Sequence, residues 1–398
     1  MKLIFPNLTY QKIGGAENMV YEIAKVAYRN KNITSILIGN SKSLVVKRLT
    51  EDKIPFIFLP QDQLDLGKID NSKDNLLINF HYFNGFSKLR ELEAKSIIWG
   101  ILAPQVTEWN GINIKKHWTG RKEIGDIFTR KLLANMHKKN SFISMDGATS
   151  DAINDFMGEK REWPTISIPV DINDARNLKK KVSLAHCLQI SYIGRSDDVW
   201  KIKPVKKFIQ DLNKIKNKLF NIHIYTDNMA PFLGELKDVR SEHVSVEYHT
   251  GLYGPLIRSH LNEHSDLHIS MGTAALEGGL AGLPTILIDA SPHDFPENYR
   301  YRWLFQTEQN SLGRFIGADE SGFFGMTMEE VVETCFDERA RTAAAEDCIQ
   351  YVLENHSALK ITEKLLAHPV QATMKDICRF TPATWRSVST VKAFFSRN

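Results

Sequence analysis

Glycine, threonine and glutamate recur at a chemically useful spacing in residues 268–289, which read HISMGTAALEGGLAGLPTILID. The apolar run before Gly272 predicts a strand, and the residues after it predict a short helix that begins near Thr273. Free backbone N–H groups at a helix start suit an anion such as a diphosphate. Glu277 follows one turn later, where its carboxylate could accept hydrogen bonds from the two cis hydroxyls of a ribose. A plain strand–helix–strand unit with a surface glutamate is the alternative, and the spacing favours a ligand site.

Two adjacent glycines, Gly14 and Gly15, lie between the first apolar run of the chain and its first helical pattern. Glycine lets a ligand approach the backbone closely, which again suits an anionic group. A tight turn is the simpler interpretation. The dinucleotide-binding pattern G-x-G-x-x-G is absent, and residues 38–40 lack the acidic side chain that holds a ribose in that motif. We therefore expect a loop that approaches a phosphate.

Basic residues follow the first predicted strand of the second half, in the segment YIGRSDDVWKIKP. Arg195 comes directly after that strand, and Lys201 and Lys203 follow a few residues later. Positive charge here could offset the negative charge that develops on a departing diphosphate. A solvated basic loop is the alternative, and either lysine could be the partner of Arg195.

His81 directly follows the strand predicted at residues 76–78, where it could orient or deprotonate a sugar hydroxyl. A structural histidine is the equal alternative. His223, His249 and His268 lie in or beside predicted strands and are assigned no role. The four cysteines form no C-x-x-C pair and lie at no zinc-binding distance from a histidine along the chain, so we expect neither a metal site nor a cofactor.

These residues need a scaffold that brings strand ends together. Short apolar runs alternate with helical patterns, which predicts α/β architecture with parallel sheets covered by helices on both faces. The expected strands are 3–5, 33–38, 54–59, 76–78, 97–99 and 142–144, then 189–193, 222–225, 244–246, 267–269 and 285–288. Residues 328–366 are expected to be helical.

The alternation pauses in a polar, lysine-rich stretch, which predicts a linker between two domains. We expect a Rossmann-like domain at 1–170, the linker at 171–182, a second Rossmann-like domain at 183–366, and a helical tail at 367–398 that could pack back on the first domain. Open α/β sheets bind ligands beyond the carboxyl ends of their strands. A cleft between the two domains would therefore hold the residues singled out above.

The composition is that of a soluble globular protein, with 42% hydrophobic and 25% charged residues among 398. A net charge of +4 makes no case for nucleic acid by itself. The N-terminus lacks an apolar stretch long enough for a signal peptide, and no run of about 18 apolar residues is present. Unpaired cysteines fit a reducing compartment. We expect a cytoplasmic protein.

Together these motifs resemble the family-4 sugar-nucleotide glycosyltransferases. Residues 14–17 are similar to the G-G-A-E loop of that family, Arg195 with Lys201 resembles its G-R…K element, and residues 276–289 resemble its E-A-M-A-x-G-x-P-V-I segment. The resemblance covers residues 1–358 and implies two Rossmann-like domains facing a cleft, the arrangement called GT-B. It also implies that Arg195 and Lys201 contact the donor diphosphate and that Glu277 binds the donor ribose.

The chain departs from the family in one respect. The usual E-x7-E pair is incomplete, because Ile269 stands eight residues before Glu277. Residues 271–279 are instead similar to the G-T-x-x-L-E turn of other GT-B enzymes, such as lipid A disaccharide synthase. Most family-4 enzymes retain the anomeric configuration, and the missing first glutamate leaves both stereochemical outcomes open here.

Basic and aromatic residues are mixed in two segments. Residues 114–140 hold eight Lys and Arg residues together with Trp118, Phe128 and Leu132, and residues 384–398 read TWRSVSTVKAFFSRN. Such a surface suits peripheral contact with an anionic membrane. A solvated helix face and a packed tail are the equal alternative. No nucleic-acid-binding module is recognised, so nucleic acid is not an expected partner.

The combined expectation is a metal-independent glycosyltransferase that uses a nucleotide-diphosphate sugar and a saccharide or lipid-linked acceptor entering near His81. The resemblance suggests bacterial surface-polysaccharide synthesis (O-antigen, capsule or lipopolysaccharide), at the inner face of the plasma membrane. A nucleotide-sugar epimerase of the same architecture and a non-catalytic sugar-nucleotide-binding partner protein are the alternatives. The sequence leaves the sugar, base, acceptor, linkage and oligomeric state open.

Overall fold

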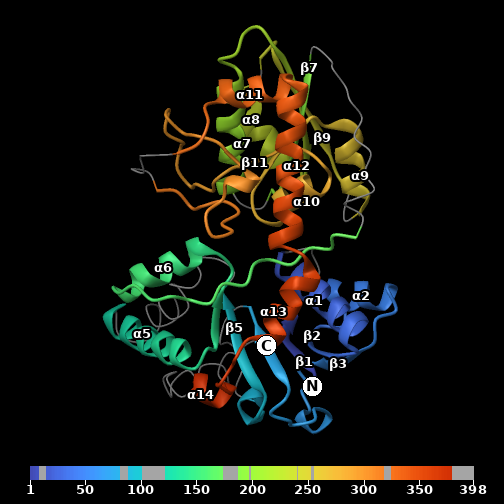
Figure 1. Ribbon diagram of the computed structural model, residues 1–398, viewed down its shortest axis with the longest axis vertical. Coiled ribbons are helices and arrows are strands. Elements are labelled where there is room, and N and C mark those ends of the chain that lie inside the picture. Colours follow the sequence, from blue (N-terminus) through green and yellow to red (C-terminus); the bar gives the residue numbers. More distant parts are fainter. Residues whose placement is uncertain are drawn as a thin grey trace, which may run out of the picture. The chain divides into compact units, whose positions relative to one another are not determined.

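Figure 1 shows a computed structural model of the full chain. It describes residues 1–8, 15–80, 88–100, 122–173, 187–196, 199–239, 241–251, 255–317 and 324–378. The chain divides into two compact units, which we call unit 1 (residues 1–169 and 358–398) and unit 2 (residues 170–357).

Unit 1 contains a parallel six-stranded sheet with the strand order β3-β2-β1-β4-β5-β6. Its strands are β1 (Leu3–Leu8), β2 (Ser35–Gly39), β3 (Phe56–Pro60), β4 (Leu76–Asn79), β5 (Lys95–Gly100) and β6 (Phe142–Ser144). Every residue of β2, β4 and β6 is buried. Continuous burial is typical of parallel strands covered on both faces.

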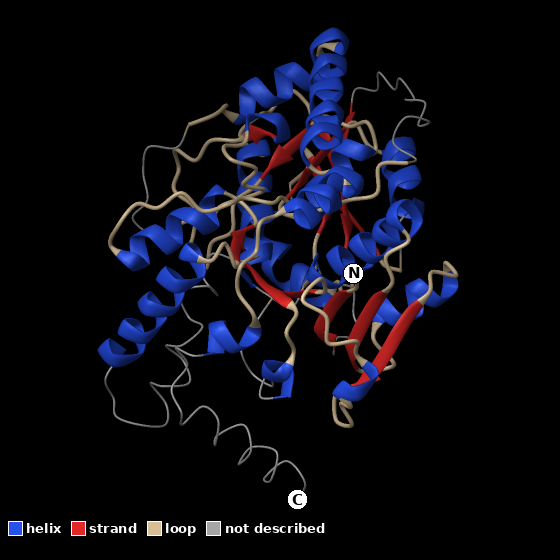
Figure 2. Cartoon of the chain, turned by 60° about the horizontal axis from the view of Figure 1, so that its bottom comes forward, coloured by secondary structure: helices blue, strands red, loops and turns tan. Residues whose placement is uncertain are grey.

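The helices of unit 1 are among those coloured blue in Figure 2. They are α1 (Gly15–Lys31), α2 (Leu44–Glu51), α5 (Lys122–Lys138), α6 (Gly147–Met157), α13 (Ala358–Ala367) and α14 (Met374–Cys378), with 3₁₀ turns η1 (Leu66–Lys68) and η2 (Lys88–Glu91). The apolar face of α1 is buried, as Met19, Ile23 and Ala27 show. Asp146 caps α6, because its carboxylate accepts the backbone N–H of Thr149 at 2.8 Å.

Unit 2 contains a second six-stranded sheet, in the order β12-β11-β10-β7-β8-β9. Its strands are β7 (Cys187–Ile193), β8 (Leu219–Tyr225), β9 (Val244–His249), β10 (Leu267–Ser270), β11 (Thr285–Leu287) and β12 (Arg302–Trp303). All pairs are parallel except β11 with β12. The eleven expected strands are present with ends shifted by a few residues, and the short antiparallel β12 was not expected.

The helices of unit 2 cover this sheet. They are α7 (Val199–Leu212), α8 (Ala230–Leu236), α9 (Pro255–His264), α10 (Thr273–Leu280), α11 (Met328–Phe336) and α12 (Glu338–Asn355), with 3₁₀ turns η4 (Lys237–Val239) and η5 (Leu304–Gln306). Two consecutive caps fix the start of the helical region. Thr327 and Glu330 form a capping box before α11, and Asp337 caps α12.

The two sheets have the same topology. Numbered within each unit, both run 3-2-1-4-5-6, the strand order of a Rossmann-like sheet. The order reverses between β1 and β4 in unit 1 and between β7 and β10 in unit 2. The expected pair of Rossmann-like domains is therefore present, and each has one topological switch point.

The division between the units differs from the expected boundaries near the C-terminus. The second domain was expected to run to residue 366, whereas α13 belongs to unit 1. The physical reason is that α13 packs on α1, where Glu363 and Lys31 form an exposed ion pair at 3.8 Å. The start of the tail, α14, packs on α5 and η2, and residues 379–398 lie outside the described residues.

Part of the basic segment proposed as a membrane surface belongs to the core of unit 1. Leu132, which was expected on that surface, is 1% exposed and packs in the core beneath α5. Arg130 donates to the backbone oxygen of Phe156 at 3.0 Å, and Lys139 pairs with Asp376 at 2.7 Å. Residues 114–121, the Phe128 side chain and the tail from residue 384 lie outside the description. Among the described helices, none has the length and apolar character that crossing a bilayer requires.

Candidate functional site

The carboxyl ends of β7 and β10 lie side by side at the switch point of unit 2. The hydroxyl of Ser270, the last residue of β10, donates to the backbone oxygen of Ile193, the last residue of β7, at 2.8 Å. Arg195 follows β7 by two residues, and Gly272 and Thr273 follow β10. The fold thus brings three of the predicted site residues to the edge where open α/β sheets bind ligands.

Gly272 forms the N-cap of α10 in a backbone conformation that only glycine adopts readily, with φ 59° and ψ −144°. Its own N–H donates to the backbone oxygen of Leu312 at 2.6 Å. Because Gly272 has no side chain, it cannot cap the first N–H groups of α10. Those groups suit an anion, as predicted for Gly272 and Thr273, and ligand binding here stays a prediction.

Glu277 lies on α10 and is half-buried, whereas its neighbours Leu276 and Leu280 are fully buried. It is not a plain surface carboxylate, because Arg258 of α9 holds both of its oxygens. Arg258 Nε donates to Oε2, and Nη2 donates to Oε1 at 3.1 Å. Each carboxylate oxygen can still accept a further hydrogen bond, so the predicted ribose contact remains open to Glu277.

Arg258 was not expected from the sequence, and it links three segments of unit 2. Its third nitrogen, Nη1, donates to the backbone oxygen of Asp171 at 2.9 Å. The Arg258 side chain is 9% exposed and the Glu277 side chain 18%, so the pair is largely shielded from water. A bidentate Arg–carboxylate pair fixes the carboxylate plane as well as its position. Arg258 therefore orients Glu277 at the switch point.

His268 supports α10 from below. It is fully buried, accepts the hydroxyl proton of Ser191 at Nδ1 (2.9 Å) and donates from Nε2 to the backbone oxygen of Ala274 (3.1 Å). Burial lowers the pKa of His268 to about 4, so its ring is neutral at pH 7. Its role is structural, because both ring nitrogens are satisfied and the bond to Ala274 fixes the first turn of α10.

The loop after β7 is held by an aspartate at the end of the neighbouring strand. Asp227 Oδ1 accepts the backbone N–H and the hydroxyl of Ser196, each at 3.1 Å. Arg195 immediately precedes this anchored residue and is exposed. Sequence reasoning missed Asp227, although it follows β8 in the same way as Arg195 follows β7. The same strand-end rule would have found it.

The first turn of α7 is opened by Pro204, which has no N–H to donate back to Trp200. The freed carbonyl of Trp200 instead faces the backbone N–H of Ser291 at 3.4 Å. The next carbonyl, that of Lys201, accepts the Tyr192 hydroxyl at 3.1 Å. These two contacts tie the start of α7 to β7 and to the loop after β11.

Lys201 and Lys203 leave α7 in different directions, because two residues rotate about 200° around a helix. The Lys201 ammonium lies 4.6 Å from the centre of the Trp200 ring. Lys203 pairs with Asp294 at 3.2 Å, and that carboxylate is 97% exposed. Such an exposed pair is weak and leaves Lys203 available to a ligand. Both lysines therefore remain candidates for the predicted diphosphate contact.

In unit 1 the predicted residues follow the two strands of its switch point. Gly15 begins α1 after β1, and it is exposed. Gly14 and His81, which follows β4 by two residues, lie outside the described residues. The predictions for Gly14 and His81 therefore rest on their positions in the sequence and the strand order.

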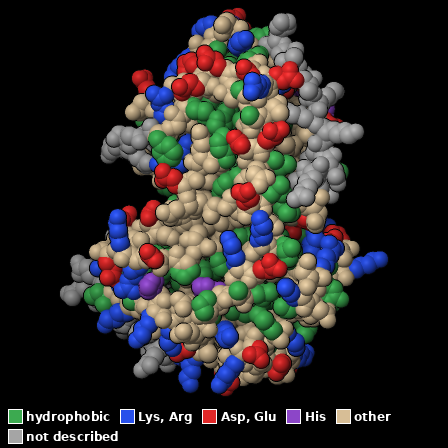
Figure 3. Space-filling view, viewed as in Figure 1, with side chains coloured by type: hydrophobic (Ala, Val, Ile, Leu, Met, Phe, Trp, Pro, Cys, Tyr) green, Lys and Arg blue, Asp and Glu red, His purple; other side chains and the backbone are tan. Residues whose placement is uncertain are grey.

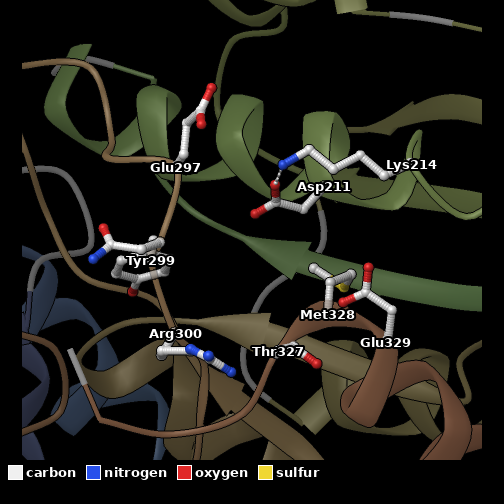
Figure 4. A pocket seen from close by; sticks show the side chains of 9 residues that line it. Asp211, Lys214, Glu297, Tyr299, Arg300, Thr327, Met328 and Glu329 are labelled. Atoms are coloured by element: carbon white, nitrogen blue, oxygen red, sulfur yellow. Dashed lines mark hydrogen bonds and ion pairs between the residues drawn. The ribbon is translucent and has the colours of Figure 1, made fainter.

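Figure 4 shows a separate feature of unit 2, a cavity of about 140 Å³ lined by charges of both signs. On one wall, Lys214 Nζ lies 2.8 Å from Asp211 Oδ1. Arg300 and Glu329 line the opposite wall. Asp211 lies in the last turn of α7, which returns antiparallel to the strands. The cavity therefore lies toward the amino ends of the strands, away from the switch point.

Comparison with known proteins gives matches in structure but none in sequence. No protein-family model matches the chain, and neither does any curated protein. A glycosyltransferase from Rickettsia africae matches with 14% identity and a TM-score of 0.58, over 92% of this chain and 97% of that one. A point mutant of TarM from S. aureus, in complex with fondaparinux, α-GlcNAc-glycerol and UDP, matches with 13% identity and a TM-score of 0.58, over 92% of this chain and 99% of that one. Anabaena Alr3699/HepE in complex with UDP and glucose matches with 14% identity and a TM-score of 0.56, over 92% of this chain and 98% of that one.

These likenesses extend over nearly the whole of each chain and include both Rossmann-like units. At such low identity they establish the fold, which is the GT-B fold of these glycosyltransferases. They carry no information on individual site residues, which the geometry above supplies.

Proposed function

We propose that this protein is a glycosyltransferase that moves a sugar from a nucleotide-diphosphate donor to a saccharide or lipid-linked acceptor. The observation that supports this most strongly is the joined ends of β7 and β10 on a GT-B fold. The exposed Arg195 follows β7 by two residues, Gly272 follows β10 by two residues and forms the N-cap of α10, and Arg258 holds Glu277 one turn further along that helix. A diphosphate would bind at the helix start, and Glu277 would accept hydrogen bonds from the ribose.

In the proposed reaction the nucleotide diphosphate is the leaving group. Its bond to the anomeric carbon breaks, so negative charge grows on the departing oxygen. The N–H groups of α10 and the cations Arg195 and Lys201 would stabilise that charge, and they would do so without a metal ion. We therefore expect transfer to continue in the presence of EDTA.

The acceptor would bind on unit 1, near His81 and the loop of Gly14 and Gly15. A setting in surface-polysaccharide synthesis is supported by the similarity to WaaG, described as a glycosyltransferase of lipopolysaccharide biosynthesis (14% identity, TM-score 0.52). A lipid-linked acceptor would require the enzyme to reach an anionic membrane surface, and the basic residues of unit 1 would favour that contact. The protein would then work in the cytoplasm at the inner face of the membrane.

The experiment that tests the proposal is a thermal-stabilisation screen of nucleotides and nucleotide sugars, followed by assays of transfer and of donor hydrolysis. Uridine diphosphate is the first nucleotide to test, because the TarM and HepE structures contain it. A ligand present at 100 times its Kd stabilises the folded state by about 2.7 kcal/mol. No stabilisation by any nucleoside diphosphate would overturn the proposal.

The assays also separate the two alternatives. An epimerase would convert the donor sugar with no acceptor present. A non-catalytic binding partner would be stabilised by nucleotide yet show neither transfer nor slow donor hydrolysis. Transfer to an acceptor, or slow donor hydrolysis without epimerisation, supports the glycosyltransferase.

A further inference from the structure

Polar side chains line one face of the unit 2 sheet at its edge. β8 contributes His223, and the edge strand β9 contributes Glu247 and His249. His223 is in register with Glu247, and His249 follows two residues later on the same face. The three side chains therefore converge although they come from distant parts of the sequence.

Their donor atoms face a common point. His223 Nδ1 lies 3.0 Å from His249 Nε2 and 3.6 Å from Glu247 Oε2, and all three atoms lie within 4.8 Å of one another. Two ligands bound 2.0–2.1 Å from a tetrahedral zinc ion are about 3.3 Å apart. Small movements of these three side chains would therefore bring their donor atoms to the spacing of ligands around a zinc ion.

A second layer of amides orients the donor atoms. His223 Nε2 lies 2.9 Å from the side-chain oxygen of Gln189, an acceptor, so Nε2 carries the proton and the Nδ1 lone pair faces the cluster. Asn221 donates to Glu247 Oε1 at 2.9 Å and to the Gln189 oxygen at 3.2 Å, and its amide nitrogen lies farther from His223 Nε2, at 3.3 Å. A histidine that binds a metal through one ring nitrogen commonly donates the N–H of the other ring nitrogen to such an oxygen.

Packing restrains the remaining ligand. The His249 ring stacks on Tyr225, with centroids 4.7 Å apart and planes 18° apart, and the His260 ring of α9 lies 5.7 Å from His249 and 5.5 Å from Tyr225. His223 is buried, whereas Glu247 reaches solvent. A hydrogen bond between two imidazoles would explain the 3.0 Å contact alone. It would not explain why the Glu247 carboxylate, which accepts a hydrogen bond from Asn221, also lies beside the two imidazoles.

We propose that His223, Glu247 and His249 bind one divalent transition-metal ion, of the class of zinc. Two imidazole nitrogens and one carboxylate oxygen form a ligand set that zinc accepts, with water completing the shell. Because the ligands come from β8 and β9, the ion joins the edge strand to the rest of the sheet. Its role is structural, and it adds stability to unit 2 by binding the folded state.

The metal site is distinct from the proposed transfer chemistry. In the strand order, β9 is separated from β10, whose end begins the diphosphate site, by β7 and β8. Loss of the metal should therefore lower the stability of unit 2 and leave the diphosphate chemistry metal-independent. Failure of the glycosyltransferase proposal would not affect this site, because its test measures metal binding and not turnover.

The test uses the full chain without a polyhistidine tag, stripped of metal and titrated with Co²⁺ and then Zn²⁺. We expect one equivalent of Co²⁺ to bind with the visible absorption of a tetrahedral complex, displacement of Co²⁺ by Zn²⁺, and a rise in Tm on Zn²⁺ binding. Glu247→Gln and His249→Gln should each weaken Zn²⁺ binding at least about tenfold, and Gln189→Ala about 10- to 100-fold through the second layer. His293→Gln, an exposed histidine of unit 2 outside the cluster, is the matched control and should bind as the wild type does.

Glu247→Gln keeps the proposal testable, because this exposed change should leave the fold intact. Circular dichroism and the Tm without metal check that expectation. The proposal is overturned if the wild type binds no stoichiometric Co²⁺ or Zn²⁺. It is equally overturned if the folded Glu247→Gln and His249→Gln variants bind Zn²⁺ with unchanged affinity.

Discussion

Units 1 and 2 share one sheet topology but carry opposite charge. Unit 1 contains 31 Lys and Arg residues against 20 Asp and Glu, whereas unit 2 contains 20 against 27. On the face shown in Figure 3, blue Lys and Arg side chains are frequent over unit 1, and red Asp and Glu side chains are frequent over unit 2. The small net charge of the whole chain hides this difference.

The difference shows that two domains with the same sheet topology can have electrostatic fields of opposite sign. The overall charge of unit 2 opposes a nucleotide diphosphate, so the proposed binding there would depend on local groups, namely the start of α10, Arg195 and Lys201. The excess positive charge of unit 1 acts over a longer range. It would attract an anionic acceptor or membrane surface within the screening length of about 8–10 Å.

The largest expected effect tests the local cations of unit 2. Arg195→Ala should lower kcat by about 10²–10³, because its charge matters most when the diphosphate departs, and should change donor Kd much less. Lys201→Ala should act in the same direction. Lys216→Ala, an exposed lysine that follows the C-terminal end of α7, is the matched control. Single-turnover kinetics and donor titration measure the two quantities. If donor Kd rises as far as kcat falls, the cations contribute to binding alone.

The next effect concerns acid stability. Among the described residues, the buried histidines His223, His268 and His356 all lie in unit 2. The pKa of His268 is about 4 in the folded state and 6.5 in a free side chain, so the unfolded chain binds more protons between these values. Stability should therefore fall as pH drops from 6.5 to 4, by about 3 kcal/mol for this group.

Hydrogen exchange followed by peptide mass spectrometry measures this effect in each unit. Amides of β10 and α10 should lose protection at pH 5 before those of β1 and β4. In the His268→Gln variant the pH dependence of unit 2 should be shallower, although its stability at pH 7 should be lower. Equal loss of protection in both units would contradict the expected difference in acid stability between unit 2 and unit 1.

A smaller effect is expected from the carboxylate that would hold the ribose. Glu277→Ala should weaken nucleoside-diphosphate binding by about 10- to 100-fold, since hydrogen bonds to charged groups contribute about 1.5–3 kcal/mol. Arg258→Lys should have a weaker effect in the same direction, because lysine keeps the charge and loses the two-pronged contact. Calorimetry gives the affinities, and thermal unfolding checks the fold. An unchanged affinity of Glu277→Ala would remove this residue from the site.

The smallest effect per residue is expected at a membrane. Each basic residue near an anionic surface contributes at most about 1 kcal/mol, and salt screens it. Binding to anionic vesicles should therefore be reversible and weaker at high salt, and Lys131→Gln on the exposed side of α5 should reduce it by up to about fivefold. Lys216→Gln, an exposed lysine of unit 2, is the matched control. Equal and negligible co-sedimentation with anionic and neutral vesicles at low salt would favour a soluble acceptor.

The sequence predicted the elements of the fold well, because each buried parallel strand is a short apolar run. It also predicted the position of Arg195 and Gly272, because a residue that follows a parallel strand must lie at the carboxyl edge of the sheet; their contacts with a ligand stay predictions. The predictions failed for β12, whose two residues pair antiparallel with β11 and are too few to show a period. Leu132 was misplaced because its position among lysines hid its place in the core.

Contacts between side chains on different elements were beyond the sequence. Arg258 and Glu277 are 19 residues apart on two helices, and nothing in either helix marks the other as its partner. His223 and His249 are likewise 26 residues apart and meet because β8 and β9 pair in one particular register. Such pairs follow from the three-dimensional packing, which a single sequence does not specify by pattern alone.

Unit 2 is one continuous stretch of chain, and its two ends are paired. Val170 and Ser357 form a parallel bridge, with the Val170 N–H donating to the backbone oxygen of His356 at 2.8 Å. Unit 1, by contrast, includes α13, which packs on α1 and which the ribosome synthesises only after residue 357. During translation unit 2 can therefore complete its fold first, while unit 1 waits for α13 to reach α1. The usual order, in which the N-terminal domain matures before the next, would then be reversed in this chain.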